Sequence, residues 1–140
     1  MESQKKVLIT GGAGYLGSVL TWYLLEKGFH VTCLDDLRYG QNSIFFYASN
    51  PNFNFIYGDV RNKDLLRGII SNFDIIILRY FNPYGPGELH DPETHAIPNF
   101  IKAALGKTPI PLFWKGEQIR DFIYIDDLAQ AHILPLNLRG

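Results

Sequence analysis

The sequence predicts an α/β fold built on a Rossmann-like parallel sheet. Short apolar runs alternate with helical patterns through the first eighty residues, and such alternation favours parallel strands joined by right-handed crossovers. A glycine-rich turn follows the first apolar run, and two aspartates follow the second, at Asp35 and Asp36. After Asn82 the chain changes to a loop rich in glycine, proline and histidine. The second region is therefore expected to be smaller and less regular than the first.

The first half is predicted to contain four strands and two helices. Gly28 ends the first helix, since glycine readily closes a helix. In the second helix, Leu65, Leu66, Ile69 and Ile70 fall on one face. For residues 41–49 the sequence does not decide between a loop and one or two helical turns. The predicted strands are Lys6–Thr10, 30–34, Phe53–Tyr57 and 74–80, and the helices are 15–27 and 62–71.

The fourth predicted strand, 74–80, is a continuous apolar run, which is typical of a strand covered on both faces. Beyond it, residues 83–98 form a long loop and 97–105 a helix closed by Gly106. Two short strands are expected at 110–114 and 122–125. Asp126 is expected to cap a final helix that Pro135 stops.

Composition narrows the class of protein. The chain has 140 residues, 46% of them hydrophobic, and a net charge of −1, as expected of an ordinary globular domain. This balance gives no general attraction to nucleic acid or to an anionic membrane, and no apolar run could span a bilayer. The single cysteine, Cys33, allows no internal disulfide and is expected to be buried in a strand. With no cleavable signal pattern at the start, a cytoplasmic location is expected.

The strongest chemical motif is the glycine turn. Gly11, Gly14 and Gly17 lie between an apolar strand and a predicted helix. Such a turn presents backbone N–H groups and the positive end of a helix dipole to a diphosphate. The three glycines would provide the sharp exit from the strand, the approach to phosphate and the close helix packing.

Two acidic positions extend this interpretation. Asp35, at the end of the second strand, can accept hydrogen bonds from ribose hydroxyls and repel a 2′-phosphate, which favours NAD over NADP. Arg38 weakens that preference, and the alternative role for Asp35 is a turn residue. Asp59 and Val60 could flank the adenine edge and face, although Asp59 could instead cap the helix that begins near Asn62.

Five motifs resemble the extended short-chain dehydrogenase/reductases. Within that group they are similar to the NAD-dependent nucleotide-sugar epimerases and dehydratases, such as UDP-glucose 4-epimerase. The motifs are TGGAGYLG at 10–17, LDDL at 34–37, GDVR at 58–61, LRYFNPYGPGE at 78–88 and RDFIYIDDLA at 120–129.

The resemblance implies a role for each matched residue. An arginine suits a nucleotide-sugar diphosphate because its planar guanidinium binds phosphate oxygens bidentately. The alternative for Arg120 is a local ion pair with Asp121. The implied contacts are Gly11, Gly14, Tyr15, Leu16 and Gly17 to the NAD diphosphate, Asp35 and Asp36 to the ribose, Asp59 and Val60 to adenine, Tyr80 and Phe81 beside the nicotinamide, and Asn82 and Arg120 to the nucleotide sugar.

The family's catalytic residues have no counterpart here. They are a Tyr-x-x-x-Lys pair with a nearby Ser or Thr, located between the fourth strand and the LRYFN motif. In this chain, residues 73–77 run directly into 78–82. The sequence therefore predicts an internally shortened relative, lacking about a hundred residues of a complete two-half fold. Residues 1–82 would be the dinucleotide-binding part, and 83–140 a partial nucleotide-sugar-binding part in the same compact domain.

Other candidate catalytic groups are weaker. Tyr23 and Lys27 have the right spacing, but they lie at the far end of the helix that follows the glycine turn. His132 is expected to be a partly exposed helix residue. Tyr84 and Tyr124 have no suitably spaced lysine. We assign no catalytic residue.

A loop cluster could also suggest a metal site. Its acidic and histidine spacing matches no ligand pattern, so we expect a solvated loop and no metal. The cluster consists of Glu88, His90, Asp91, Glu93 and His95.

Three functions follow from these expectations. The first is a protein that binds NAD, a UDP- or dTDP-linked sugar, or both, without efficient turnover. The second is an active enzyme with rerouted or partner-supplied catalytic residues. The third is a non-enzymatic assembly module, in which the edge of strand 74–80 pairs with a second copy of the chain.

Overall fold

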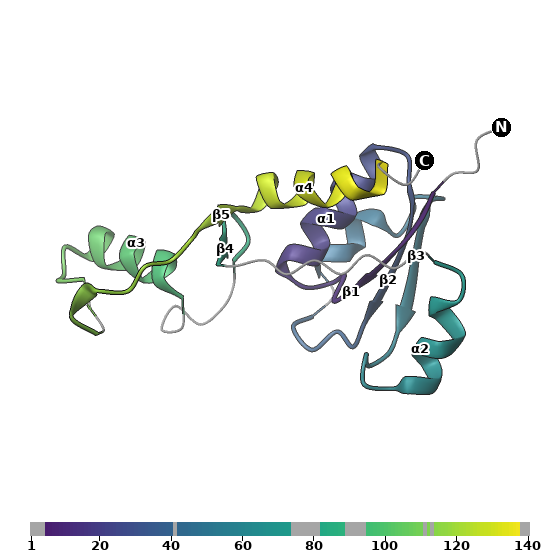
Figure 1. Ribbon diagram of the computed structural model, residues 1–140, viewed down its shortest axis with the longest axis horizontal. Helices are drawn as coiled ribbons and strands as arrows, with labels where there is room; N and C mark the ends of the chain where they lie inside the picture. The colour runs from purple at the N-terminus through teal and green to yellow at the C-terminus, as the bar shows by residue number, and fades with distance from the viewer. Residues whose placement is uncertain are drawn as a thin grey trace.

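Among the described residues, a three-stranded parallel sheet forms the centre of the N-terminal part (Figure 1). Its strands lie in the order β1 (Lys6–Thr10), β2 (His30–Asp35), β3 (Phe53–Tyr57). The register places Ile9 beside Cys33 and Cys33 beside Phe55. This confirms the predicted α/β class. The computed structural model describes residues 5–40, 42–73, 82–88, 95–110, 112 and 114–137.

Helices cover both faces of the sheet. The helix α1 (Tyr15–Glu26) packs against one face, with the short helix η1 (Asn42–Tyr47) beside it. The helix α2 (Lys63–Ile70) lies on the opposite face (Figure 1). The last helix, α4 (Ile125–Asn137), runs along α1. None of the described helices combines the length and apolar character needed to cross a membrane.

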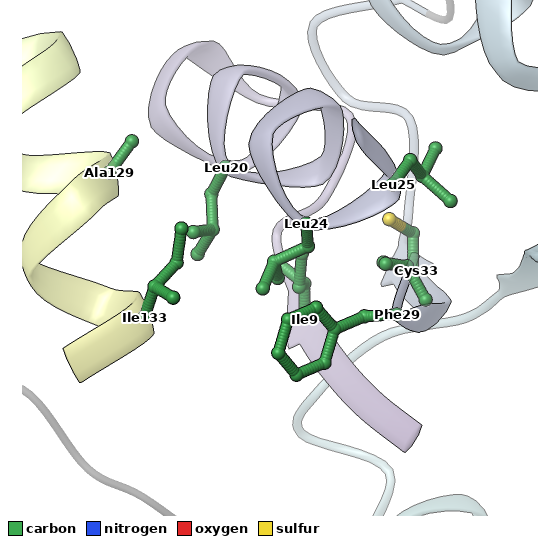
Figure 2. Packing of buried hydrophobic residues seen from close by; sticks show 9 residues of the cluster. Ile9, Leu20, Leu24, Leu25, Phe29, Cys33, Ala129 and Ile133 are labelled. Atoms are coloured by element: carbon green, nitrogen blue, oxygen red, sulfur yellow. The ribbon is translucent and has the colours of Figure 1, made fainter. Parts of the chain in front are cut away.

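The core lies between α1, α4 and the sheet. Figure 2 shows Leu20 and Leu24 of α1 facing Ala129 and Ile133 of α4. Leu24 is 1% exposed and Ala129 fully buried. Residues of α4, late in the chain, therefore share one hydrophobic core with Ile9 of β1.

A small second region lies away from this core. The strands β4 (Pro83–Tyr84) and β5 (Ile123–Tyr124) form a two-residue parallel pair. The ring of Tyr84 contacts those of Phe122 and Tyr124 edge-on. Beyond the pair, the helix α3 (Ala96–Gly106) projects away from the sheet, followed by the short helix η2 (Trp114–Gly116) (Figure 1).

Most predicted elements of the first half are confirmed. The strand limits at β1 and β3 match, and the first helix ends one residue early, at Glu26. The open segment 41–49 contains η1, and the apolar residues of α2 are half-buried. Cys33 is fully buried, as expected, and burial raises the pKa of its thiol to about 11.

Two of the later predictions need correction here, and a third lies outside the described residues. The strand at 110–114 is wrong: residues 110 and 112 are not in a strand, because Pro109 and Pro111 remove the N–H donors that a ladder needs. Lys107, with φ of 50°, takes the left-handed position after α3, rather than Gly106. The strand predicted at 74–80 lies outside the described residues.

The final helix also differs from the prediction. It begins at Ile125, so Asp126 lies in its first turn and is not the capping residue. Pro135 lies inside the helix and does not stop it. So close to the end, a proline removes a single backbone hydrogen bond, and the two following residues complete the helix.

Candidate functional site

The glycine turn connects the carboxyl end of β1 to α1 and lies against the carboxyl end of β2. Gly11 has a φ of 72°, in the left-handed region that glycine adopts without strain. Its N–H donates to the carbonyl oxygen of Leu34 at 2.8 Å, and its own carbonyl accepts from the N–H of Gly14 at 3.1 Å. The turn is therefore fixed by backbone contacts to the next strand.

Gly17 lets α1 begin directly above this turn. A Cβ on Gly17 would collide with the carbonyl oxygen of Gly11. A Cβ on Gly12 would collide with the side chain of Cys33. No other residue type fits at either position without moving backbone or core.

The amino end of α1 carries no side-chain cap. Gly14 is the N-cap residue and offers no side chain, and the first turn contains no acidic residue. The first N–H groups of a helix have no partner within the helix, and together with the helix dipole they attract an anion. The Tyr15 and Leu16 that the sequence assigns to this site are the first two residues of α1.

Asp35 lies against the turn. One carboxylate oxygen, Oδ2, accepts from the N–H of Ala13 at 3.0 Å, and Oδ1 accepts from the N–H of Leu37 at 2.7 Å. Each oxygen can accept a second hydrogen bond. Asp35 is therefore hydrogen-bonded directly to the glycine turn, while it also fills the alternative role of a turn residue.

Asp36 and Asp59 follow adjacent strands, and each is paired with an arginine two residues later. Arg38 contacts Asp36 at 3.2 Å, and Arg61 forms an ion pair with Asp59. Hydrogen bonds from the side chain and the backbone of Arg61 lower the pKa of Asp59 to about 2. Val60, between Asp59 and Arg61, is 47% exposed, so its side chain is available to a ligand.

The alternative that Asp59 caps α2 is wrong. Asn62 is the N-cap residue, and its side chain accepts from the N–H groups of Asp64 and Leu65. The carboxylate of Asp59 accepts from Arg61 instead. Only the backbone carbonyl of Asp59, which accepts from the N–H of Asn62 at 2.9 Å, contacts the start of the helix.

The predicted nucleotide-sugar residues lie together in the second region. Asn82 has a left-handed φ of 39°, and its side-chain amide donates to the carbonyl oxygen of Asp121, next to Arg120. Arg120 is exposed and donates to Gln118 and to the carbonyl oxygen of Ile119, rather than pairing with Asp121. Tyr80 and Phe81 lie outside the described residues.

The ring of Tyr15 connects the two regions. A Cβ on Gly85, whose φ is 152°, would lie 3.1 Å from the Tyr15 hydroxyl and 2.5 Å from Ile125. Burial, with the nearby Glu88 carboxylate next in importance, raises the pKa of Tyr15 to about 12. The loop that follows Asn82 is therefore held between the first residues of α1 and α4.

The expectation of a solvated acidic loop is wrong for Glu88. Its side chain is 6% exposed, and it contacts Nδ1 of His95, the N-cap residue of α3, at 2.7 Å. A carboxylate this buried needs such a partner. His90, Asp91 and Glu93 lie outside the described residues. In the part of the chain that is described, no three His, Cys, Asp or Glu side chains are grouped to hold a metal.

One residue that holds the glycine turn from another element could not be recognised in the sequence. The hydroxyl of Ser43, in η1, donates to the carbonyl oxygen of Ala13 at 2.5 Å, across thirty residues of sequence. An isolated serine in an ambiguous segment gives no indication of such a contact. Only the folded backbone brings it to the turn.

Tyr23 and Lys27 lie far from the glycine turn. Lys27 is the C-cap residue of α1, at the opposite end from Gly14. The ring of Tyr23 contacts Trp22 edge-on, with centroids 4.7 Å apart. His132 is half-buried and its Nδ1 lies 2.7 Å from the carbonyl oxygen of Leu128. None of these three side chains is part of the candidate site.

Comparison with curated proteins gives partial matches. The UDP-glucose 4-epimerase of Rhizobium meliloti (strain 1021) is 42% identical over an alignment of 79 residues that covers 47% of this chain and 24% of that protein. The low-salt glycan biosynthesis protein Agl12 of Haloferax volcanii is 36% identical over an alignment of 74 residues that covers 51% of this chain and 24% of that protein. The chain thus spans about a quarter of the length of these relatives.

Solved structures share the fold over most of the chain. The dTDP-glucose 4,6-dehydratase of Bacillus anthracis, in complex with NAD, superposes with a TM-score of 0.68 at 19% identity, covering 91% of this chain and 70% of that one. The UDP-glucose 4-epimerase of Thermotoga maritima, with UDP-glucose, gives 0.69 at 18% identity, covering 93% and 72%. Both confirm the Rossmann-like fold.

The family assignment rests on two long matches. The NAD dependent epimerase/dehydratase family matches residues 7–77 and, separately, residues 71–139. The first match contains the glycine turn, Asp35 and Asp59, and the second contains Asn82 and Arg120. The chain belongs to the NAD dependent epimerase/dehydratase family.

Proposed function

We propose that this chain binds NAD at the glycine turn and a nucleotide sugar beside Asn82 and Arg120, without efficient turnover. In the bound state NAD would supply the hydride acceptor for oxidation at a sugar carbon. The described residues would hold and orient the two ligands. The proposal assigns no proton-transfer step to them.

The observation that carries NAD binding is the structure of the turn itself. The amino end of α1 has neither a capping side chain nor an acidic residue, and Gly17 leaves no room for a side chain above Gly11. The carboxylate of Asp35 lies at the same surface, hydrogen-bonded to Ala13. A diphosphate at the helix and a ribose at Asp35 fit this arrangement.

The nucleotide-sugar part rests on the second region and on the relatives. Asn82 and Arg120 are brought to adjacent backbone positions by the β4–β5 pair. Relatives that match the chain are epimerases of UDP-glucose and of other nucleotide sugars. The exposed guanidinium of Arg120 suits a diphosphate.

The expectation of weak turnover rests on the junction between residues 73 and 82. The family matches end and begin there, overlapping only at 71–77. The one Tyr-x-x-x-Lys spacing in the sequence is Tyr23–Lys27, at the wrong end of α1. General acid–base catalysis contributes about 10²–10⁴-fold in rate, so its loss would remove useful turnover.

Calorimetry with NAD, combined with a turnover assay on UDP- and dTDP-sugars, tests the proposal. We expect the wild-type chain to bind NAD and to release no product. Asp35→Ala should weaken NAD about tenfold or more, because a hydrogen bond to a charged group is lost. Asp64→Ala is the matched control, since Asp64 is exposed at the start of α2.

Two results would contradict the proposal. Folded wild-type protein that gives no heat with NAD would remove the binding function. Turnover of a nucleotide sugar that disappears in Asp35→Ala or Tyr84→Phe would instead establish an active enzyme with rerouted residues.

We also propose that a second copy of the chain pairs with the predicted strand at 74–80, which lies outside the described residues. Among the described strands, β1 pairs only with β2, and the family order places the fourth strand beside β1. A shortened sheet would leave that strand at an edge. A solution mass equal to twice that of the monomer supports this assembly, and a monomer at high concentration contradicts it.

A further inference from the structure

The pair formed by Asp59 and Arg61 uses most of the acceptor capacity of one carboxylate. The backbone N–H of Arg61 donates to Oδ1 at 2.8 Å, and Nε lies 3.0 Å from Oδ1 and 2.9 Å from Oδ2. Its Nη2 donates to Oδ2 at 2.5 Å. A carboxylate offers about four lone-pair sites. Since the Nε–H is shared between both oxygens, three donor groups of Arg61 fix the orientation of the Asp59 carboxylate and leave about one acceptor site for a ligand.

Asp59 and Arg61 lie at the end of the candidate site where the adenine of a bound NAD would be located. Asp59 follows β3 by two residues, and the N–H of Gly58 donates to the carbonyl oxygen of Asp35 at 3.0 Å. The carboxyl end of β3 is thus attached to the strand end that carries the ribose-side carboxylate.

A second pair of the same kind stands on the neighbouring loop. Arg38 contacts Asp36 at 3.2 Å, again with a spacing of two residues. The charges of the two loops also act on each other, since Arg38 helps to lower the pKa of Asp59 and Asp36 helps to raise the pKa of Arg61. Opposite charges therefore alternate across the two strand ends.

We infer that Arg61 is a positioning residue for adenine recognition: by holding Asp59 from one side, it directs the remaining acceptor of that carboxylate toward an exocyclic amino group. This inference rests on the proposed NAD function and deepens it. It predicts that the site distinguishes an amino-bearing purine from one that carries a carbonyl at the same position.

The test compares NAD with nicotinamide hypoxanthine dinucleotide, which lacks the exocyclic amine. We expect wild-type protein to bind NAD about tenfold more tightly, the cost of leaving a charged acceptor unpaired. In Arg61→Gln, the affinity for NAD should fall while that for the hypoxanthine analogue changes little, so that the ratio approaches one. A purely structural role would weaken both ligands equally.

Two further variants separate geometry from charge. Arg61→Lys keeps the positive charge but not the planar guanidinium, so it should lose the discrimination as Arg61→Gln does. Arg67→Gln is the matched control: Arg67 is also paired with an aspartate and its side chain is equally exposed, at 77%. It should keep the wild-type ratio.

The outcomes distinguish this inference from the proposed function. If wild-type protein binds NAD but shows no preference over the hypoxanthine analogue, the inference is wrong and NAD binding stands. An unchanged ratio in Arg61→Gln, or full discrimination in Arg61→Lys, also overturns it. If the folded wild-type chain does not bind NAD at all, the proposed function itself fails.

Discussion

Two single side chains, from β2 and η1, fix the backbone of the glycine turn. Asp35 holds the N–H of Ala13, and Ser43 holds the carbonyl oxygen of the same residue. Both groups of the Ala13 backbone are therefore fixed by side chains from β2 and η1. Contacts of this kind keep the turn in one conformation before any ligand binds, which lowers the entropic cost of binding.

Asp59 should titrate well below an ordinary aspartate. Hydrogen bonds from Arg61 lower its pKa from 3.8 to about 2. A lowered pKa means that the pair stabilises the fold above pH 3.8 and that this contribution is lost as the pH falls toward 2. Carbon-13 NMR of the carboxyl group across this range measures the midpoint directly.

In Arg61→Gln the same carboxyl should return toward its ordinary pKa. An Asp59 midpoint near 3.8 in the wild-type protein would show that the pair does not form in solution.

At the scale of elements, α1 packs closely on the glycine turn because residue 17 has no side chain to collide with the carbonyl group of Gly11. We expect Gly17→Ala to destabilise the fold by about 1–3 kcal/mol, because the new methyl group meets the Gly11 carbonyl. NAD binding should be lost with it. Urea denaturation and calorimetry measure the two effects.

Gly68→Ala is the matched control for this substitution. Gly68 lies in α2 with open space around the added Cβ. Alanine should therefore stabilise the helix by about 0.5–1 kcal/mol. If Gly17→Ala behaved in the same way, the close packing of turn and helix would be disproved.

Elements with a local signal could be predicted from the sequence. The strands β1 and β3 have apolar runs with clear ends, and the glycines mark both ends of the first helix. The segment 110–114 has an equally apolar pattern, but Pro109 before it and Pro111 within it lack the N–H groups that a ladder needs. The left-handed Lys107 could not be predicted, since Gly106 offered the more usual position for that conformation.

The candidate site divides in the same way. The glycine turn and Asp35 form a local pattern with known spacing, so the sequence located them. Ser43 and the burial of Glu88 depend on chain segments that meet only in the folded protein. The cap at Asn62 was uncertain because Asp59 was an equally good candidate by residue type alone.

At the scale of the whole molecule, the packing of α4 on α1 joins the later part of the chain to the sheet. Ile133 is 5% exposed in the core, whereas the next residue, Leu134, is 66% exposed. We expect Ile133→Ala to lower the free energy of unfolding by about 2–5 kcal/mol. Denaturation monitored by tryptophan fluorescence measures the change.

Leu134→Ala, one residue further along α4, should change stability by less than about 0.5 kcal/mol. Equal effects from the two variants would mean that α4 does not pack on α1 as described.

The same packing determines when the chain can fold. The Nζ of Lys5, immediately before β1, donates to the carbonyl oxygen of Leu136 near the end of α4, 131 residues away. Contacts of such long range require the closure of a large loop, which slows folding. During synthesis, the face of α1 that packs on α4 remains uncovered until α4 has been made. The helix that follows the glycine turn therefore gains its full packing only from a helix far later in the chain.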